Sequence, residues 1–202
     1  MARITAILDA TEGGAVAREA RGLSIVLLYA AYERLLRGLA RAILEAALGL
    51  RAGNRRLRPR LQVFAVLGRL RAVSQTSYGQ MWDGRGLDVV EALNLRRTCT
   101  VSTDAFPNDG THMRREQIMS FCGAFGLADP APVLREAWDR IDNIVAQRNA
   151  IAHGERTPDE VGRSYTIDDI RELVLVWEAR WFDFLAWVER QADSRAFFLM
   201  PR

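Results

Sequence analysis

The stretch RNAIAHG at residues 148–154 decides the fold prediction, because it closes one helical pattern and leads into another. Before it, apolar residues recur at steps of three and four, which is the period of an amphipathic helix. The glycine at its end is a common helix stop, since glycine adopts the positive φ that closes a last turn. The sequence therefore predicts a helix that starts after Pro132 and ends near Gly154. Its apolar positions are Val133, Leu134, Ala137, Trp138, Ile141, Ile144 and Val145.

A second long helix is expected soon after this stretch. Thr166 is followed by Asp168 and Asp169, and carboxylates in a first turn favour a helix start. A long apolar stripe then runs through residues 170–188. Its aromatic side chains are expected to lie in the core or in a dimer interface.

The same period predicts further helices toward the N-terminus. Gly49 and Gly126 follow two of them as stops. One short strand-like run at residues 98–102 has no evident partner, so it does not make a sheet. The prediction is an all-α antiparallel helical bundle with long first and last helices and an irregular middle segment, forming a single domain over residues 1–202. The further helices cover residues 15–48, 61–73, 87–95 and 111–125.

The charge composition favours an anionic partner. All 28 cationic side chains are arginine, the formal net charge is +3 and the pI is about 9.3. Nucleic acid is favoured over membrane, because the most apolar stretch, residues 23–36, already contains Glu33 and Arg34. The N-terminus lacks the order of a secretory signal, so a cytoplasmic location is expected.

Metal or cofactor chemistry is not predicted. Cys99 and Cys122 form no Cys-x-x-Cys pair, so they are expected to be small buried or half-buried thiols. His112 and His153 are far apart in the sequence and neither belongs to a carboxylate–histidine cluster. This gives too few ligands for a metal hydrolase.

A turn-rich connection after Gly49 carries five arginines that are candidates for RNA binding. A cluster of arginines on a loop attracts phosphates, although such a run is more often solvated surface. Both interpretations stay open at this point. The five residues are Arg51, Arg55, Arg56, Arg58 and Arg60.

The RNAIAHG stretch also carries the candidate chemistry. Arg148 can pair with a phosphate, and His153 can exchange a proton near neutral pH. On an ideal helix Asn149 and His153 share a face, whereas Arg148 lies about 140° from His153. A two-fold partner that brings a second copy of the stretch opposite the first is one way to form a shared site.

Such a cleft contains the minimum set of groups for cleaving an RNA linkage. One neutral histidine takes the proton of the ribose 2′-hydroxyl, a second protonated histidine donates to the leaving 5′-oxygen, and Arg148 stabilises the charge on the phosphoryl oxygens. The internal nucleophile implies RNA rather than DNA. Equally, Arg148 can simply pair at the helix C-terminus and His153 can be a last-turn residue stabilised by the helix dipole.

Residues 148–154, together with residues 141–147 and the helix from Thr166, resemble the R-x-x-x-x-H region of the HEPN ribonuclease superfamily. The segment LLYAAYE at residues 27–33 is similar to the opening helix of its RiboL-PSP-HEPN-like branch. The resemblance implies an all-α bundle, a homodimer with the motif at the interface, and metal-independent RNA cleavage. Relatives often act in toxin–antitoxin or anti-phage systems, which implies an antitoxin or another defence protein as partner.

Carried over by position, the resemblance implies that Arg148 and His153 are the catalytic pair and that Asn149 is the polar residue after the arginine. Glu33 either orients Arg148 or is a solvated helix charge, and His112 is structural or exposed. Some relatives place a tyrosine two residues after the histidine, where an antitoxin can modify it, but this chain has Glu155 there. The expected function is a dimeric endoribonuclease that leaves 2′,3′-cyclic phosphate. The alternative is a non-catalytic HEPN-like module that binds RNA, a nucleotide or a protein.

Overall fold

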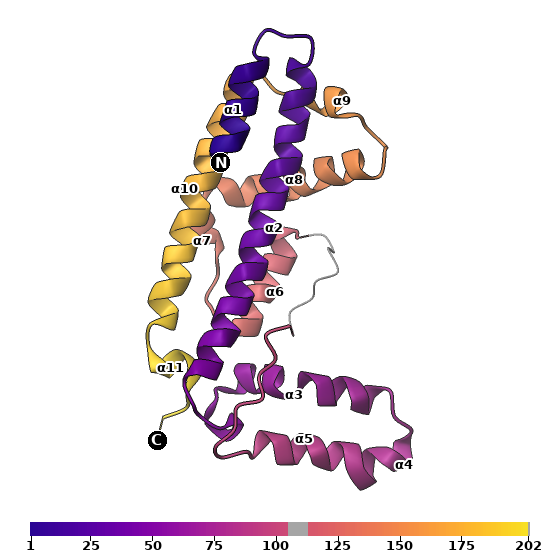
Figure 1. Ribbon diagram of the computed structural model, residues 1–202, viewed down its shortest axis with the longest axis vertical. Helices are drawn as coiled ribbons and strands as arrows, with labels where there is room; N and C mark the ends of the chain where they lie inside the picture. Colours follow the sequence, from indigo (N-terminus) through magenta and orange to yellow (C-terminus); the bar gives the residue numbers. More distant parts are fainter. Residues whose placement is uncertain (105–112, 202) are drawn as a thin grey trace. The chain divides into compact units, whose positions relative to one another are not determined.

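A computed structural model describes residues 1–104 and 113–201 (Figure 1). In these residues the regular structure is helical, apart from one isolated bridge between Leu57 and Leu199. The all-α prediction is therefore confirmed. The main helices are α1 (Ala2–Thr11), α2 (Ala17–Gly49), α3 (Pro59–Ser74), α5 (Gly86–Leu93), α6 (Arg115–Phe125), α8 (Glu136–Ala152) and α10 (Ile167–Ala192). Shorter elements are η1 (Asn54–Arg56), α4 (Tyr78–Gln80), η2 (Met81–Arg85), α7 (Ala131–Leu134), α9 (Pro158–Gly162) and α11 (Arg195–Phe198).

The chain divides into two compact units. Unit 1 comprises Met1–Leu36, Thr111–Cys122 and Ala128–Trp187. Unit 2 comprises Arg37–Gly110, Gly123–Leu127 and Val188–Arg202. The single domain expected over residues 1–202 stays a prediction.

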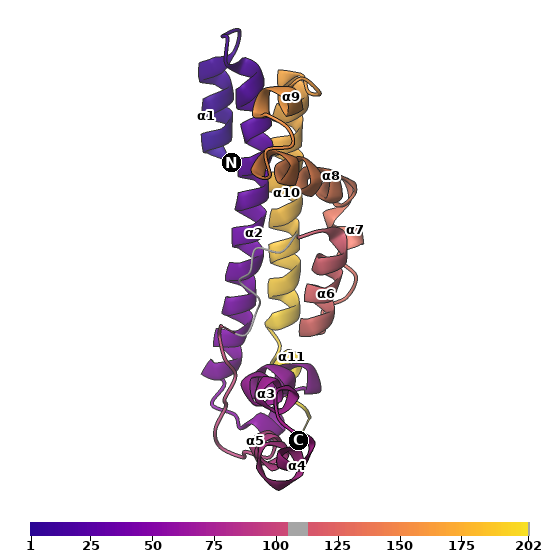
Figure 2. The same cartoon turned by 90° about the vertical axis from the view of Figure 1, so that its right-hand side faces the viewer.

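Three helices lie side by side in unit 1 (Figures 1 and 2). Arg171 on α10 donates to Asp9 and Glu12 at the end of α1, each at 2.8 Å, which fixes these two helices together. α1 runs antiparallel to both neighbours, whereas α2 and α10 run in the same direction. Among these three helices, each antiparallel pair therefore includes α1. The helix α1 was not predicted from the sequence, because its buried side consists of only two residues, Ile4 and Leu8, which give a weak helical period.

Aromatic side chains fill the core of unit 1. Tyr32 on α2 stacks on Trp181 of α10, with ring centroids 5.4 Å apart and an interplanar angle of 10°. Tyr32 also meets Trp177 edge to face at 5.6 Å. All three rings are at most 3% exposed. The aromatic positions Trp177, Trp181 and Phe184 of the predicted stripe therefore lie in the core, whereas Phe182 on the same helix is exposed.

Two glycines allow α9 to approach α2. A Cβ on Gly22 would lie 2.0 Å from the carbonyl oxygen of Pro158, and a Cβ on Gly162 would lie 1.9 Å from that of Arg18. Only glycine fits where two backbones are this close. Arg21 completes the contact, since its Nε donates to the Gly162 carbonyl at 3.1 Å.

A buried amide organises unit 2. Asn54 is fully buried, its Nδ2 donates to the Ala92 carbonyl and to Thr100 Oγ1, and its Oδ1 accepts from the Thr100 backbone N–H. These bonds hold Thr100, in the connection at residues 98–102, beside η1 and α5. As expected, this strand-like run forms no sheet.

Most predicted helix boundaries agree with the structure, and α2, α3, α5 and α10 lie within a few residues of their predicted ranges. The helix predicted from residue 111 begins at Arg115, while Thr111 and His112 lie outside the described residues. Gly126 follows α6 with a φ of 78°, so it is the predicted stop.

The helix predicted to start after Pro132 is not continuous, and this part of the prediction is wrong. Arg135 has φ 43° and ψ −118°, which separates α7 from α8. Its N–H donates to Ala131, and its carbonyl accepts from Trp138. Leu134 and Ala137 on either side are both fully buried. The hydrophobic period does not reveal this break, because the residues on both sides of it are buried and the apolar pattern continues across it.

Candidate active site

Arg148 lies in the last turns of α8 and is held in a fixed position. Its guanidinium carbon is 4.4 Å from the centroid of the Tyr29 ring on α2. Its Nη1 also donates to Asn149 Oδ1 at 3.0 Å. A guanidinium over an aromatic face is attracted by the ring quadrupole, and the attraction is stronger where water is excluded. The arginine is half-buried, so the contact with Tyr29 fixes a partly desolvated cation.

The support beneath Arg148 is buried and closely packed. Tyr29 is 1% exposed and meets Tyr32 edge to face at 5.2 Å. The Tyr32 hydroxyl donates to the Met113 carbonyl just before α6. Burial raises the pKa of Tyr32, with Tyr29 and Glu33 acting in the same direction and Arg148 lowering it. Tyr32 therefore stays neutral and acts as a packed hydrogen-bond donor.

His153 has the opposite environment. It is the C-terminal cap of α8, its N–H donates to the Asn149 carbonyl at 2.9 Å, and its side chain is exposed. Gly154 follows with a φ of 72°, the left-handed conformation that closes a helix end. The backbone N–H groups of Glu155 and Arg156 then both donate to the Ala150 carbonyl. The imidazole is thus presented to solvent from an ordered turn.

The segment after the turn is also fixed. Thr157 and Glu160 form a capping box at the start of α9, with the Thr157 N–H donating to Glu160 at 2.7 Å and the Glu160 N–H donating to Thr157 at 3.2 Å. Because α9 packs on α2 through Gly22 and Gly162, the turn after His153 is held at both ends.

Arg148 donates a hydrogen bond to Asn149, whereas the His153 side chain is exposed at the end of the same helix. Arg148 faces the Tyr29 ring of its own chain, while His153 faces solvent one turn later. Within one chain the described contacts therefore do not form a closed arginine–histidine pair. The structure therefore places one guanidinium against Tyr29 and Asn149 and leaves one imidazole exposed; the shared site stays a prediction.

Glu33 lies half-buried on α2, one turn after Tyr29. Glu33 raises the pKa of the Tyr32 hydroxyl, whereas Arg148 lowers it. Glu33 is therefore part of the electrostatic surroundings of the arginine support. Sequence reasoning missed Tyr29 as a site residue, because an aromatic side chain on an amphipathic helix has no signal that separates an arginine support from ordinary core.

The five arginines of the predicted RNA-binding connection belong to unit 2 and divide into two groups. Arg56 donates to the Met200 carbonyl at 3.3 Å and Arg58 donates to the Ala196 carbonyl at 2.8 Å, so both hold the C-terminal segment. Arg51, Arg55 and Arg60 are exposed, as is Arg58. The connection is therefore partly structural and partly available to an anion.

Both cysteines agree with their prediction as small thiols in the protein. Cys99 is half-buried and Cys122 is buried. Burial raises the pKa of the Cys122 thiol to about 12. In the described residues, no group of three or more histidine, cysteine, aspartate or glutamate side chains is placed to hold a metal ion. No helix in the described parts is long and apolar enough to cross a membrane.

Comparison with known proteins assigns the family. The model of the RiboL-PSP-HEPN family matches residues 4–177. The match includes α2 with Tyr29, α8 with Arg148, and the turn with His153. Searches of curated proteins and of solved structures gave no match. The helical bundle and the extent of the match lead to one conclusion: the chain belongs to the RiboL-PSP-HEPN family.

Proposed function

We propose that this chain is a metal-independent endoribonuclease whose active site is completed by a second copy of the chain. The observation that carries the proposal is the contrast between the two motif residues. Arg148 is fixed on Tyr29 and Asn149, whereas the His153 side chain is exposed at the end of the same helix. A fixed cation and an accessible proton carrier are the components of phosphodiester cleavage.

The second copy supplies what one chain lacks. If two α8 ends approach around a two-fold axis, two His153 side chains and two Arg148 guanidinium groups face one cleft. One histidine, in its neutral form, takes the proton of the ribose 2′-hydroxyl as that oxygen attacks phosphorus. The other, protonated, donates its proton to the departing 5′-oxygen. The products are a 2′,3′-cyclic phosphate end and a 5′-hydroxyl end.

Arg148 stabilises the extra charge on the non-bridging oxygens during this step. Asn149 supports it by accepting a hydrogen bond from Nη1. The exposed Arg51, Arg55 and Arg60 then serve as contacts to the RNA backbone.

The proposed biological class is a toxin or anti-phage effector that cuts cellular RNA in the cytoplasm and is restrained by an antitoxin or another defence protein. Family membership supports this class. Glu155 occupies the position where some relatives carry a modifiable tyrosine, so restraint of this chain is proposed to use binding rather than modification at that residue.

The test is incubation of the purified chain with mixed cellular RNA in a chelator, followed by analysis of the product ends. Wild type is expected to give 2′,3′-cyclic phosphate ends, and Arg148→Ala and His153→Ala are each expected to lose at least about a hundredfold in rate. Arg140→Ala is the matched control, because Arg140 is an exposed arginine on the same helix.

Cleavage retained by a double variant at Arg148 and His153 would reject the proposal. If the wild-type chain and the variants all bind RNA and none of them cleaves it, the non-catalytic binding module becomes the better description.

A further inference from the structure

Unit 2 contains a pocket that the proposed cleavage chemistry does not use. Its walls come from the start of α3, from the end of α6 and from α11, and its volume is about 400 Å³. A space of this size lies within the range of small-ligand sites. The residues that give it chemical character are Arg58, Arg60, Phe125, Gly126 and Phe197.

Two guanidinium groups border the pocket. Arg58 is held there because its Nε donates to the Ala196 carbonyl at 2.8 Å. Arg60 is exposed, and its stem crosses Gly126: a Cβ on Gly126 would lie 3.1 Å from Arg60 Cδ. No acidic residue is among those lining the pocket in the described part of unit 2. The pocket therefore suits an anion.

Aromatic rings form the apolar side of the pocket. Phe125 is 3% exposed and stacks on Phe64 with centroids 4.9 Å apart, which makes it a fixed apolar wall. Phe197 is half-buried and is supported edge to face by Phe198 at 4.9 Å. Its ring is accessible enough to contact a ligand. The pocket thus combines cations for a phosphate with a ring for a flat apolar group.

We propose that this pocket binds a nucleotide, with the phosphate at Arg58 and Arg60 and the base against Phe197. Guanidinium groups match phosphate oxygens in a bidentate manner. Bases stack on aromatic side chains with little regard to sequence. The ligand is either a free nucleotide or one unit of an RNA strand, since both present the same chemistry. Binding of a free nucleotide here goes beyond the proposed function, whereas the RNA case rests on it, because Arg60 is also one of the proposed contacts to the RNA backbone.

The experiment measures binding by calorimetry on the full chain carrying His153→Ala, so that RNA added later is not cut by the proposed site. Adenosine 5′-monophosphate is titrated first, and inorganic phosphate and adenosine are titrated as its two halves. Saturable binding of the nucleotide is expected, with both halves binding more weakly. Thermal unfolding is recorded for every variant to confirm that it is folded.

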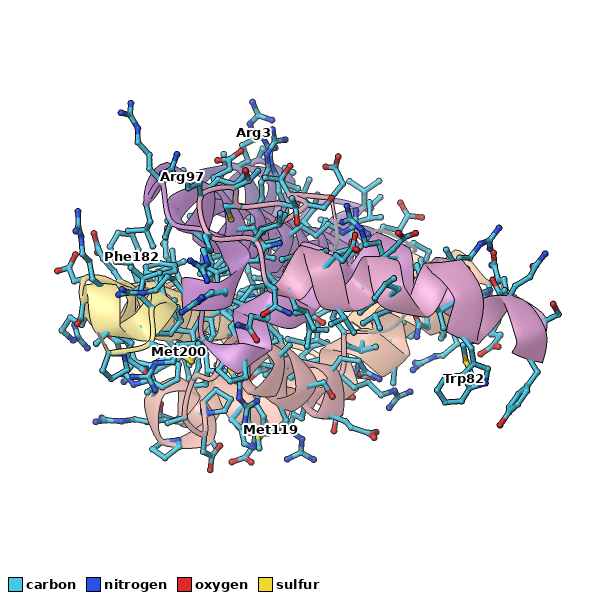
Figure 3. The ribbon with its side chains drawn as sticks, turned by 90° about the horizontal axis from the view of Figure 1, so that it is seen from below. Arg3, Trp82, Arg97, Met119, Phe182 and Met200 are labelled. Carbon is cyan, nitrogen blue, oxygen red and sulfur yellow. The ribbon has the colours of Figure 1, made fainter. Side chains whose placement is uncertain are left out.

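Two substitutions separate the two parts of the ligand. Arg60→Gln is expected to lower the affinity for the nucleotide by about tenfold and to lower the affinity for phosphate as well. Phe197→Leu keeps an apolar side chain but removes the ring. It is therefore expected to lower the affinity for the nucleotide by about tenfold and to leave the affinity for phosphate unchanged. Arg97→Gln is the matched control, because Arg97 is an exposed arginine of the same unit (Figure 3) and is not among the residues that line the pocket. It is expected to change neither affinity.

A short single-stranded oligoribonucleotide then distinguishes the two sources. If it displaces the mononucleotide and binds more tightly through Arg60, the pocket is a subsite for RNA. If it fails to compete, the ligand is a free nucleotide; both results support the pocket. The proposal is overturned if the nucleotide does not bind, or if its affinity is the same in Arg60→Gln, Phe197→Leu and the parent.

Discussion

At the scale of single residues, Tyr29 has the clearest functional consequence. Its ring lies 4.4 Å from the Arg148 guanidinium carbon and is itself fixed against Tyr32. The phenyl face makes this contact, so the hydroxyl is not needed for it. Tyr29 is therefore proposed as a positioning residue that acts through Arg148 and does not touch RNA.

This gives a prediction about Tyr29 variants. Tyr29→Phe is expected to keep near wild-type cleavage, because the aromatic face remains. Tyr29→Leu is expected to lower kcat by roughly tenfold, since the guanidinium loses its support. The measurement is steady-state cleavage of a defined RNA, well below the melting temperature of each variant.

Ile25→Val provides the control for lost packing. Ile25 is fully buried one turn earlier on α2, and the change costs about 1 kcal/mol of stability. It should leave kcat unchanged. Equal loss of activity in Ile25→Val and Tyr29→Leu, or no rescue by Tyr29→Phe, would show that Tyr29 acts only through stability.

At the scale of elements, the contact between α9 and α2 depends on glycine. A Cβ on Gly22 would lie 2.0 Å from the Pro158 carbonyl oxygen, whereas a Cβ on Gly38 of the same helix meets nothing within 4 Å. Gly22→Ala is expected to destabilise the fold by about 2 kcal/mol or more. Gly38→Ala is expected to stabilise it by up to about 1 kcal/mol, because alanine favours a helix. Denaturant unfolding measures both, and a loss at Gly38 equal to that at Gly22 would refute the contact.

Capping carboxylates give a prediction about acid. Hydrogen bonds from the Thr157 N–H and hydroxyl hold the pKa of Glu160 below its usual 4.5, and those from Thr166 hold the pKa of Asp169 below its usual 3.8. A lowered folded-state pKa contributes stability above the unfolded-state pKa, and this is lost as pH falls through the folded-state value. The melting temperature is therefore expected to decrease when the pH is lowered below about 4.5.

Glu160→Gln tests this directly, because glutamine can keep the capping geometry but does not titrate. The difference in melting temperature between pH 7 and pH 3.5 should be smaller than in wild type. Glu155→Gln, at an exposed neighbour, should leave that difference as it is in wild type. An unchanged difference in Glu160→Gln would contradict the capping argument.

At the scale of the whole molecule, the proposal predicts that chains act in pairs. Wild-type chain at constant concentration is mixed with a ninefold excess of His153→Ala chain under conditions that allow exchange. If one cleft needs a histidine from each copy, only about one wild-type chain in ten finds a wild-type partner, and activity falls to about a tenth. Cleavage of a fluorescent RNA measures this.

The control for the mixture is excess Arg140→Ala chain, which keeps both motif residues and should not inhibit. Constant activity with excess His153→Ala chain would mean that each chain carries a complete site.

Local sequence determined most of the long helices and their order along the chain. Apolar residues at a 3.6-residue period bury one face of a helix wherever the chain later packs, so α2, α3 and α10 were predictable. Gly154 and Gly126 were predictable as stops for the same local reason, since positive φ favours glycine. The position of Arg148 and His153 in the motif also follows from sequence, as does the family.

Only the tertiary structure decided how these parts are used. The Tyr29 support for Arg148, the Gly22 contact with α9 and the break at Arg135 each depend on neighbours far away in sequence or on burial of both flanks. The pocket at Arg58 and Arg60 joins three segments that no local pattern connects. The physical reason is range: helical propensity and periodicity act within a few turns, whereas contacts between distant side chains exist only after the chain has packed.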